Sequence, residues 1–456
     1  MLRSIDPSSG EEIATYATMA AAEVDELLER VQRAYPAWRG YGYGRRAEIL
    51  RRTAALLREQ LPIHAAAITA EMGKPITEAE AEIEKSAWVC QYYAEHAERF
   101  LADTPAPSDS PASFVAFAPL GAVLAVMPWN YPYWQVFRFL APALMAGNVA
   151  VLKHAANVTG CALRIERLLA EAGLPDDAFR ILRISSDQVG RVIAHPTVRA
   201  VTLTGSEPAG RAVAAAAGAS IKKTVLELGG SDPFIVLADA DIPAAASTAI
   251  RSRFGNCGQS CIAAKRVIVV DSIAEEFEAE AVAAAGRLVV GDPRQWETEL
   301  GPLARADLRA DLEDQLHRSV THGVRVIAGG NRPDRPGWFF EPTVAVAPSS
   351  DVPILREETF GPLMAVIHAS STEAALTLAN DSRFGLGGSL WTADVQRGTE
   401  LARQMDTGGV FINGMTHSDP RLPFGGVKAS GYGRELSDFG IREFTNAQTI
   451  WLPAAS

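Results

Sequence analysis

Residues 121–154 read GAVLAVMPWNYPYWQVFRFLAPALMAGNVAVLKH. The stretch contains two apolar runs, GAVLAVM (121–127) and NVAVLK (148–153), and the segment WQVFRFL between them reads as helical. Two buried strands joined through a helix form a β-α-β unit, in which the strands run parallel in one sheet. The stretch therefore predicts an α/β fold with a mostly parallel sheet and helices on both of its faces.

The same alternation continues toward the C-terminus. Strand-like runs follow at FRILRI (179–184), RAVTLT (199–204), KTVLEL (223–228) and PFIVL (233–237), separated by helical stretches that include 187–194 and 207–218. After about residue 240 a second α/β set begins, with strands expected at 265–270 and 323–329 and helices at 273–287 and 302–321. At roughly 100–200 residues per domain, a chain of 456 residues is expected to form two or three domains.

The two ends of the chain have a different character. The first hundred residues predict helices at 21–38, 45–72 and about 77–100, because apolar positions recur there at three- and four-residue spacing. Residues 103–113, rich in Pro and Ser, predict a loop or extended linker. The final residues, from Phe444 to Leu452, predict a strand.

Composition excludes several classes of protein. The net charge of −11 argues against a broad nucleic-acid or anionic-membrane surface. No apolar run approaches the ~20 residues of a membrane span, and the first residues do not read as a signal peptide. Four cysteines in 456 residues make no disulfide scaffold, so a reducing, cytoplasmic location is expected.

One cysteine stands out by its context. Residues 254–261 read FGNCGQSC, where glycines and polar residues predict a tight loop that presents the thiol of Cys261. Cys90 and Cys161 lie on apolar helical faces and are expected to be buried and structural. Cys257 is treated as structural, although it could pair with Cys261 on oxidation. No second ligand pair lies nearby, so no metal site is expected.

The segment Asn256-x-Gly258-Gln259-x-Cys261 resembles the active-site signature of the NAD(P)-dependent aldehyde dehydrogenases. Similar segments occur along almost the whole chain in the order of that family. They are Pro128-Trp129-Asn130, Lys153, Thr204-Gly205-Ser206 with Gly210, Glu227-Leu228-Gly229-Gly230, Cys261, Glu357-Glu358-Thr359-Phe360-Gly361-Pro362 and Pro423-Phe424-Gly425-Gly426-Val427-Lys428. Within the family, the runs 134–138 and 229–234 are most similar to bacterial succinate-semialdehyde dehydrogenases of the shorter type.

The resemblance implies an aldehyde dehydrogenase-like fold. It has two doubly wound α/β lobes, a Rossmann-like cofactor domain (1–102 and 120–229) and a catalytic domain (230–436). A small β oligomerisation extension (103–119 and 437–456) would pair across subunits in a homodimer or a homotetramer, because an exposed strand edge needs a partner.

The resemblance also implies the catalytic residues. Cys261 would attack the aldehyde carbonyl to give a thiohemiacetal. The side-chain amide of Asn130 and the backbone N–H of Cys261 would stabilise the oxyanion. Glu227, at the carboxyl end of a predicted strand, would be the general base that activates water to hydrolyse the thioester.

The expected cofactor is NADP or NAD, although no G-x-G-x-x-G fingerprint follows a strand. Gly205, Ser206 and Gly210 open a helix whose N-terminus can bind a pyrophosphate. By resemblance, Lys153 contacts the adenosine ribose, Glu358 and Phe360 the nicotinamide ribose, and Trp129 the cofactor channel. Many NAD-preferring members have Glu where this chain has Ala156, so a 2′-phosphate is less repelled and NADP is expected to be preferred.

A semialdehyde substrate carries a carboxylate, and Arg138 is the residue expected to bind it. Trp134 and Ser418 are expected to line the same pocket. Some succinate-semialdehyde dehydrogenases carry a second arginine six residues before the cysteine, where this chain has Gly255. Possible substitutes for that second arginine are Arg253, Ser418 and Arg421.

Other functions stay open at this point. The same chemistry could act on glutarate semialdehyde or another small aldehyde. A thiol esterase or a non-catalytic binding protein could retain the fold, and a CoA-acylating dehydrogenase is a third alternative, against which the presence of Glu227 argues.

Overall fold

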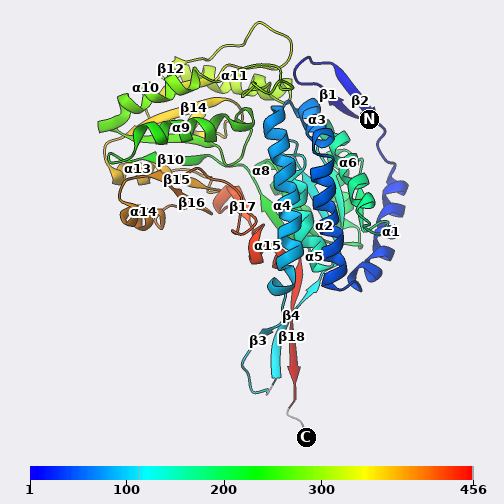
Figure 1. Cartoon of the computed structure of the whole chain (residues 1–456). Helices are drawn as coiled ribbons and strands as arrows, with labels where there is room; N and C mark the ends of the chain where they lie inside the picture. The colour runs from blue at the N-terminus through cyan, green and yellow to red at the C-terminus, as the bar shows by residue number, and fades with distance from the viewer. Residues whose placement is uncertain (111, 454–456) are drawn as a thin grey trace.

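The computed structural model describes residues 1–110 and 112–453. Two α/β lobes lie side by side, and a narrow stem projects below the first of them (Figure 1). Each lobe has its own parallel sheet and its own buried hydrophobic core. The predicted fold, two α/β lobes with a β extension, is confirmed.

The sheet of the first lobe has six strands in the order β17-β9-β8-β5-β6-β7, and only β17 is antiparallel to its neighbour. Its strands are β5 (Ala122–Met127), β6 (Val149–His154), β7 (Phe179–Ile181), β8 (Val198–Thr204), β9 (Lys223–Glu227) and β17 (Gly431–Tyr432). The opening stretch of sequence thus forms two adjacent parallel strands at the centre of this sheet.

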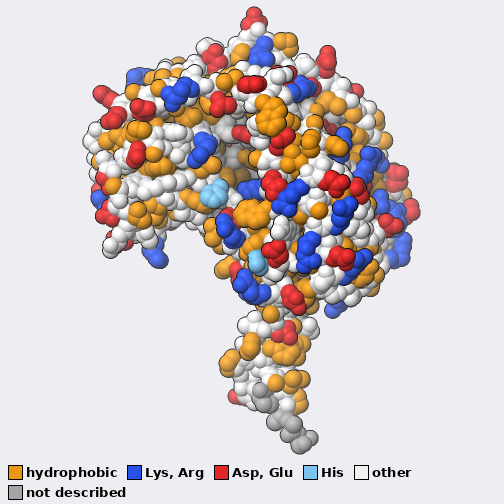
Figure 2. Space-filling model, viewed as in Figure 1, with side chains coloured by type: hydrophobic (Ala, Val, Ile, Leu, Met, Phe, Trp, Pro, Cys, Tyr) orange, Lys and Arg blue, Asp and Glu red, His pale blue; other side chains and the backbone are white. Residues whose placement is uncertain are grey.

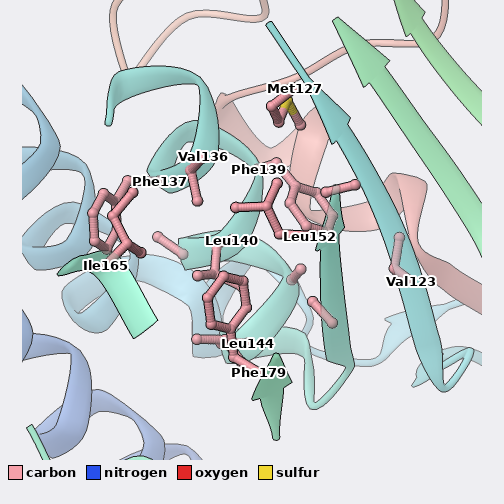
Figure 3. Packing of buried hydrophobic residues seen from close by; sticks show 14 of the residues in the cluster. Val123, Met127, Val136, Phe137, Phe139, Leu140, Leu144, Leu152, Ile165 and Phe179 are labelled. Carbon is pink, nitrogen blue, oxygen red and sulfur yellow. The ribbon is translucent and has the colours of Figure 1, made fainter. Parts of the chain in front are cut away.

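Between these two strands, α5 (Trp134–Ala146) crosses the sheet with every residue buried. Figure 3 shows Phe139, Leu140 and Leu144 of α5 packed toward Val123 of β5 and Leu152 of β6. Burying a large apolar side chain contributes about 1.5–3 kcal/mol, so this contact is a major part of the first core. β5 ends at Met127, directly before the Pro128-Trp129-Asn130 segment.

Helices cover both faces of this sheet. They are α1 (Ala21–Arg39), α2 (Tyr43–Glu59), α3 (Leu61–Met72), α4 (Ile76–Phe100), α6 (Thr159–Glu171), α7 (Val189–Ala194), α8 (Glu207–Ala219) and α15 (Ser437–Glu443). The helix expected over 45–72 is in fact two helices that meet at Gln60. The reason is Pro62 in the first turn of α3, which has no N–H to continue the preceding helix.

The N-terminal residues were expected to be helical only, and that prediction is wrong at the very start. β1 (Leu2–Ile5) and β2 (Glu12–Tyr16) form an antiparallel hairpin. Asp6 accepts backbone N–H bonds from Ser8, Ser9 and Gly10 in the turn. A two-stranded ribbon of this length has too few alternating apolar positions to be recognised from the sequence.

The sheet of the second lobe has seven strands in the order β12-β13-β14-β11-β10-β15-β16, and only β12 is antiparallel. The strands are β10 (Asp232–Val236), β11 (Ala264–Val270), β12 (Arg325–Ala328), β13 (Thr343–Ala347), β14 (Leu363–Ala369), β15 (Gly388–Trp391) and β16 (Val410–Ile412). The helices are α9 (Ile242–Phe254), α10 (Ala274–Ala285), α11 (Ala306–Thr321), α12 (Pro353–Arg356), α13 (Thr372–Asn380) and α14 (Val395–Ala402).

The stem is an antiparallel sheet of β3 (Thr104–Pro105), β4 (Ala112–Pro119) and β18 (Thr445–Leu452). The predicted C-terminal strand is therefore confirmed, and it pairs with β4 along its whole length. Hydrophobic side chains gather on the stem (Figure 2), and Trp451 and Leu452 are exposed there. Residues 111 and 454–456 of the predicted extension lie outside the described residues. The domain boundaries stay a prediction.

Within residues 1–110 and 112–453, no helix combines the length and the apolar character needed to cross a membrane.

Candidate active site

Cys261 lies in the loop that joins α9 to β11. The loop turns sharply because three successive residues, Asn256, Cys257 and Gly258, have φ of 55°, 56° and 71°. A Cβ atom on Gly258 would lie 2.2 Å from the backbone oxygen of Gly361, so only glycine fits there. The tight loop predicted from the sequence is present, and Cys261 is half-buried in it.

The remaining cysteines are free and buried. Cys90 and Cys161 are core residues of the first lobe, as predicted. The Cys257 thiol donates a hydrogen bond to the carbonyl of Gly301 at 3.1 Å. Cys257 thus packs in the interior, in agreement with its structural assignment.

Two cavities meet at Cys261. One, of about 300 Å³, is lined by side chains from α4, α5, α9 and the segment 415–424. The other, of about 340 Å³, is lined by the ends of β5, β8 and β9 and by residues of the second lobe. Cys261 and Gln135 belong to the lining of both cavities. We call them the α4 cavity and the β-edge cavity. A thiol at such a junction can contact one ligand from each side.

The surroundings of the Cys261 thiol favour its protonated form. Burial raises its pKa to about 12, and the nearby cations Lys265 and Arg138 oppose that rise only in part. The thiolate is the nucleophile, so attack on a carbonyl needs a group that accepts the thiol proton.

Asn130 lies immediately after β5 and lines the β-edge cavity beside Cys261. Its amide NH₂ donates to the carbonyl of Gln259 at 3.0 Å, and its amide oxygen accepts from Gln135 at 3.1 Å. The Asn256 amide in turn donates to the Asn130 carbonyl at 2.8 Å. These bonds fix the Asn130 side chain against the cysteine loop, and the second N–H of its NH₂ group can serve an oxyanion.

Glu227 ends β9, in agreement with its predicted place at the carboxyl edge of the sheet. Its side chain is buried, and neither carboxyl oxygen has a hydrogen-bond partner within the described residues. Burial raises the pKa of Glu227 well above its usual value, and the Glu435 carboxylate raises it further. A carboxyl group of raised pKa accepts a proton more readily than an ordinary glutamate.

Arg138 forms a buried ion pair with Glu435, in which the two side chains are 3% and 4% exposed. Arg138 also donates to the Thr204 hydroxyl at 3.2 Å and lies over the ring of Phe424. Glu435 lies seven residues after the Pro423–Lys428 segment and was not predicted from the sequence. Its pairing means that the charge of Arg138 is already compensated inside the protein.

The β-edge cavity contains the residues expected to contact a nicotinamide cofactor. Gly205 and the helix cap Ser206 precede α8 and line this cavity, together with Trp129, Glu358 and Phe360. The Trp129 and Phe360 rings meet edge to face with centroids 5.7 Å apart. Helix N-terminal N–H groups facing a cavity fit a phosphate, so the residues present fit the pyrophosphate and ribose of a dinucleotide.

Glu358 is fixed by two donors. The Lys265 ammonium lies 2.5 Å from its carboxylate and also donates to the carbonyls of Gly230 and Cys261. The Gly230 N–H donates to Glu358 at 3.1 Å. Lys265 is fully buried. It connects Glu358, the residue expected to bind the nicotinamide ribose, to the backbone of the cysteine loop. Lys265 was not predicted from the sequence, because a lysine at the start of an apolar strand has no distinctive local pattern.

Other predicted cofactor residues lie outside the two cavities. Gly210 is inside α8, where a Cβ would lie 2.6 Å from the Leu228 side chain, so it permits close packing of helix on strand. Lys153 is the second-last residue of β6, and its ammonium lies 3.5 Å from the Ser186 hydroxyl. Ala156 begins a short 3-10 turn next to it and is exposed.

All three predicted substrate residues, Trp134, Arg138 and Ser418, line the α4 cavity. Lys85 of α4 joins them and was not predicted: its ammonium donates to the Ser418 hydroxyl at 2.9 Å and lies over the Trp134 ring.

The two alternative arginines take other positions. Arg253 is fully buried and donates to backbone carbonyls of the cysteine loop and β14. Arg421 pairs with Asp419 through two hydrogen bonds, at 2.9 and 2.6 Å.

Comparison with known proteins agrees with this arrangement. Residues 1–450 match the aldehyde dehydrogenase family. An NADP(+)-dependent succinate-semialdehyde dehydrogenase of Mycobacterium tuberculosis is 47% identical over 454 residues, 99% of either chain. The NAD(P)+ succinate semialdehyde dehydrogenase Sad of Escherichia coli is 44% identical, over 98% of this chain and 97% of that one.

A solved structure is also similar over its full length. The succinic semialdehyde dehydrogenase from Streptococcus pyogenes in complex with NADP+ has a TM-score of 0.97 and 39% identity, over 99% of this chain and 100% of that one. With the family match over the whole length of its two lobes, this chain belongs to the aldehyde dehydrogenase family.

Proposed function

We propose that the protein oxidises succinate semialdehyde to succinate with NADP+, and that it also accepts NAD+. The observation that carries this proposal is the place of Cys261, a half-buried cysteine at the junction of two cavities. The β-edge cavity has the groups that suit a dinucleotide, and the α4 cavity has the positive charges that suit an anionic aldehyde.

In this proposal the Cys261 thiol gives its proton to solvent water, and the thiolate sulfur adds to the aldehyde carbon. The side-chain N–H of Asn130 and the backbone N–H of Cys261 stabilise the oxyanion of the thiohemiacetal, each worth about 3–4 kcal/mol by analogy with other oxyanion sites. NADP+ supplies the hydride acceptor when bound. The resulting thioester on Cys261 is then hydrolysed by water.

Glu227 is the proposed base for the hydrolysis. Its raised pKa and its lack of fixed hydrogen-bond partners leave the carboxylate able to take a proton from water. Water then forms the new C–O bond, the Cys261 sulfur leaves, and the proton returns through Glu227 to solvent. A base that activates water in this way favours hydrolysis of the thioester over transfer of the acyl group to a thiol such as CoA.

The preference for NADP+ rests on Lys153 and Ala156. No carboxylate occupies the position of Ala156, which is exposed next to the half-buried ammonium of Lys153. A 2′-phosphate placed there meets one positive charge and no opposing negative side chain at that position. The Streptococcus pyogenes relative, solved in complex with NADP+, supports the same choice.

The substrate is the second part of the proposal. Relatives at 44–47% identity are named as succinate-semialdehyde dehydrogenases, and Lys85, Arg138 and Arg251 line the α4 cavity. Glutarate semialdehyde and uncharged small aldehydes are the alternative substrates. Thiol esterase activity or simple binding on the same fold is the alternative from another class.

We also propose a homodimer or homotetramer in which the stem pairs with another subunit. The exposed Trp451 and Leu452 and the open strand edges of the stem support this proposal. A cytoplasmic location suits a catalytic thiol that must stay reduced.

The test is initial-rate measurement at 340 nm with succinate semialdehyde, glutarate semialdehyde and butanal, each with NADP+ and NAD+. The proposal requires kcat/KM to be highest for succinate semialdehyde with NADP+. A kcat/KM tenfold higher with NAD+ contradicts the cofactor choice. A higher value for butanal contradicts the substrate choice. Ester hydrolysis without any reduced cofactor supports the esterase alternative.

A further inference from the structure

Two segments of the candidate active site touch each other through their backbones. One is the cysteine loop, residues 255–261, and the other is the 357–361 segment, which contains Glu358. They meet so closely that a Cβ on Gly258 would lie 2.2 Å from the carbonyl oxygen of Gly361. The nucleophile and the residue expected to bind the nicotinamide ribose therefore lie on two segments whose separation is set by what holds them together.

Arg253, near the end of α9, donates hydrogen bonds to both segments. Its Nη1 donates to the Gly258 carbonyl at 3.0 Å. Its Nη2 donates to the Thr359 hydroxyl at 3.0 Å and to the Thr359 carbonyl at 3.3 Å. Its Nε donates to the carbonyl of Leu363, where β14 begins. Because a guanidinium is planar and its donors have a fixed geometry, one side chain sets the relative position of three backbone carbonyls.

The charge of Arg253 has no carboxylate beside it. The side chain is fully buried, and its hydrogen-bond acceptors among the described residues are three carbonyls and one hydroxyl. Burial lowers the pKa of Arg253, and Glu358 and Cys257 oppose that shift; a guanidinium stays charged at neutral pH. A buried cation without a carboxylate partner costs free energy. The hydrogen bonds to the two segments offset this cost and give the cation a role that an apolar side chain could not fill.

Lys265 of β11 connects the same two segments. It donates to the carbonyl of Cys261 and to the carboxylate of Glu358. Two fully buried cations, one on α9 and one on β11, thus each bond to the cysteine loop and to the 357–361 segment. Gln315 of α11 adds a bond to the Glu358 carbonyl at 3.2 Å, which steadies that segment alone.

We propose that Arg253 is a positioning residue for hydride transfer. It holds the cysteine loop and the 357–361 segment at one fixed separation, which keeps the Cys261 sulfur aligned with the Glu358 carboxylate. The inference rests on the proposed function, in which a hydride leaves the carbon bonded to Cys261 with its electron pair and reduces the cofactor, while that carbon remains bonded to sulfur as a thioester. A misplacement of about 1 Å in such a step can cost a hundredfold in rate.

Arg266 provides a matched control. It is also a buried guanidinium, and it donates to backbone carbonyls of three residues that line neither cavity, Ser231, Leu378 and Ala379. Replacing either arginine removes a buried cation and its hydrogen bonds, so the two variants should lose comparable stability. Only the loss of Arg253 should disturb the alignment of the two active-site segments.

The test uses the full-length enzyme with Arg253→Met, Arg253→Lys and Arg266→Met. Stopped-flow absorbance at 340 nm with succinate semialdehyde measures the rate constant of the first burst of reduced cofactor, and fluorescence titration measures NADPH binding. Arg253→Met should slow the burst by about a hundredfold, and deuterium at the aldehyde carbon should slow it further by a larger factor than in the wild type. Arg253→Lys should recover part of the rate. Arg266→Met should change the burst and NADPH binding less than threefold.

Thr359→Val tests the same contact with little change of shape. It removes one hydrogen-bond acceptor of Arg253, so the burst should slow and NADPH binding should weaken, each by about tenfold. Alkylation of Cys261 by iodoacetamide, in enzyme without cofactor, should stay unchanged because the bond from Arg253 to Gly258 remains. Arg253→Met, which releases the cysteine loop as well, should change the alkylation rate.

Several outcomes overturn the inference. It is wrong if Arg253→Met and Arg266→Met slow the burst equally, because the loss would then follow stability alone. It is also wrong if Thr359→Val leaves both the burst and NADPH binding unchanged, or if the isotope effect in the Arg253 variants equals that of the wild type. If circular dichroism shows that Arg253→Met is unfolded, Arg253→Lys and Thr359→Val decide the question. Failure of the proposed function is a different result, in which the wild-type enzyme gives no burst of reduced cofactor with any of the three aldehydes.

Discussion

Arg138 and Glu435 are 297 residues apart in the chain and form an ion pair in the interior of the first lobe, next to Glu227. The pair connects α5 with the segment between β17 and α15. It determines the charge around the proposed general base, because Glu435 raises the pKa of Glu227 and Arg138 lowers it.

The first prediction concerns the stability that depends on this pair. Removing one member of a buried pair leaves an uncompensated charge and costs about 3–5 kcal/mol. Glu435→Gln should therefore lower the free energy of unfolding by about that amount, measured by urea denaturation monitored by fluorescence. Glu48→Gln, which breaks the exposed pair of Arg45 and Glu48, should cost less than about 1 kcal/mol. Equal losses for the two variants would contradict the argument.

The second prediction concerns the reactivity of Cys261 in the enzyme without ligands. Since burial raises the pKa of this thiol to about 12, the thiolate fraction should grow about tenfold per pH unit throughout pH 7–10. The rate of alkylation by iodoacetamide, followed by mass spectrometry, should grow in proportion. A plateau below pH 9 would mean that the thiolate is stabilised in the resting enzyme. Cys261→Ser should remove the reaction, because the other cysteines are buried.

The third prediction separates the two halves of the proposed reaction. General-base catalysis contributes about 10²–10⁴-fold, so Glu227→Gln should lower the steady-state rate by at least about a hundredfold. If Glu227 acts only in hydrolysis, the variant should still form one reduced cofactor per active site in a rapid burst. Stopped-flow absorbance at 340 nm measures both phases. A variant that loses the burst as well would place Glu227 in the first half of the reaction.

The fourth prediction concerns Lys265 as a positioning residue for Glu358. Lys265→Met leaves the Glu358 carboxylate with the Gly230 N–H alone, and the KM for NADP+ should rise by about tenfold. Lys265→Arg should recover part of this affinity in a titration of cofactor fluorescence. Lys222→Met is the control, because Lys222 also donates to backbone carbonyls but lies away from both cavities. Unchanged cofactor affinity in Lys265→Met would show that Glu358 is fixed without the lysine.

The sequence predicts all of the parallel strands β5 to β9 in the first lobe, but in the second lobe it predicts β10, β11 and the edge strand β12 and misses β13 and β14. Runs such as those at 121–127 and 265–270 are recognisable because strands buried on both faces are continuously apolar. β15 and β16 escape recognition because they are only four and three residues long. The break at Gln60 depends on one proline within an otherwise continuous helical pattern.

The candidate site divides in a similar way. Cys261, Asn130 and Glu358 could be proposed because each occurs in a short segment with local context. Lys85 and Glu435 could not be, since their importance comes from partners far along the chain: Lys85 and Ser418 are separated by 333 positions. A charged residue within an amphipathic helix has the same local pattern whether it faces solvent or a cavity.

The junction of the two cavities at Cys261 has a consequence for the order of events. In the proposed reaction, aldehyde and cofactor reach the sulfur from two different cavities, so neither has to pass through the space of the other. Either reactant can then bind first, and the reduced cofactor can depart while the acyl group is still attached to the enzyme. Product-inhibition patterns would therefore show independent binding sites rather than competition between the acid product and the nucleotide.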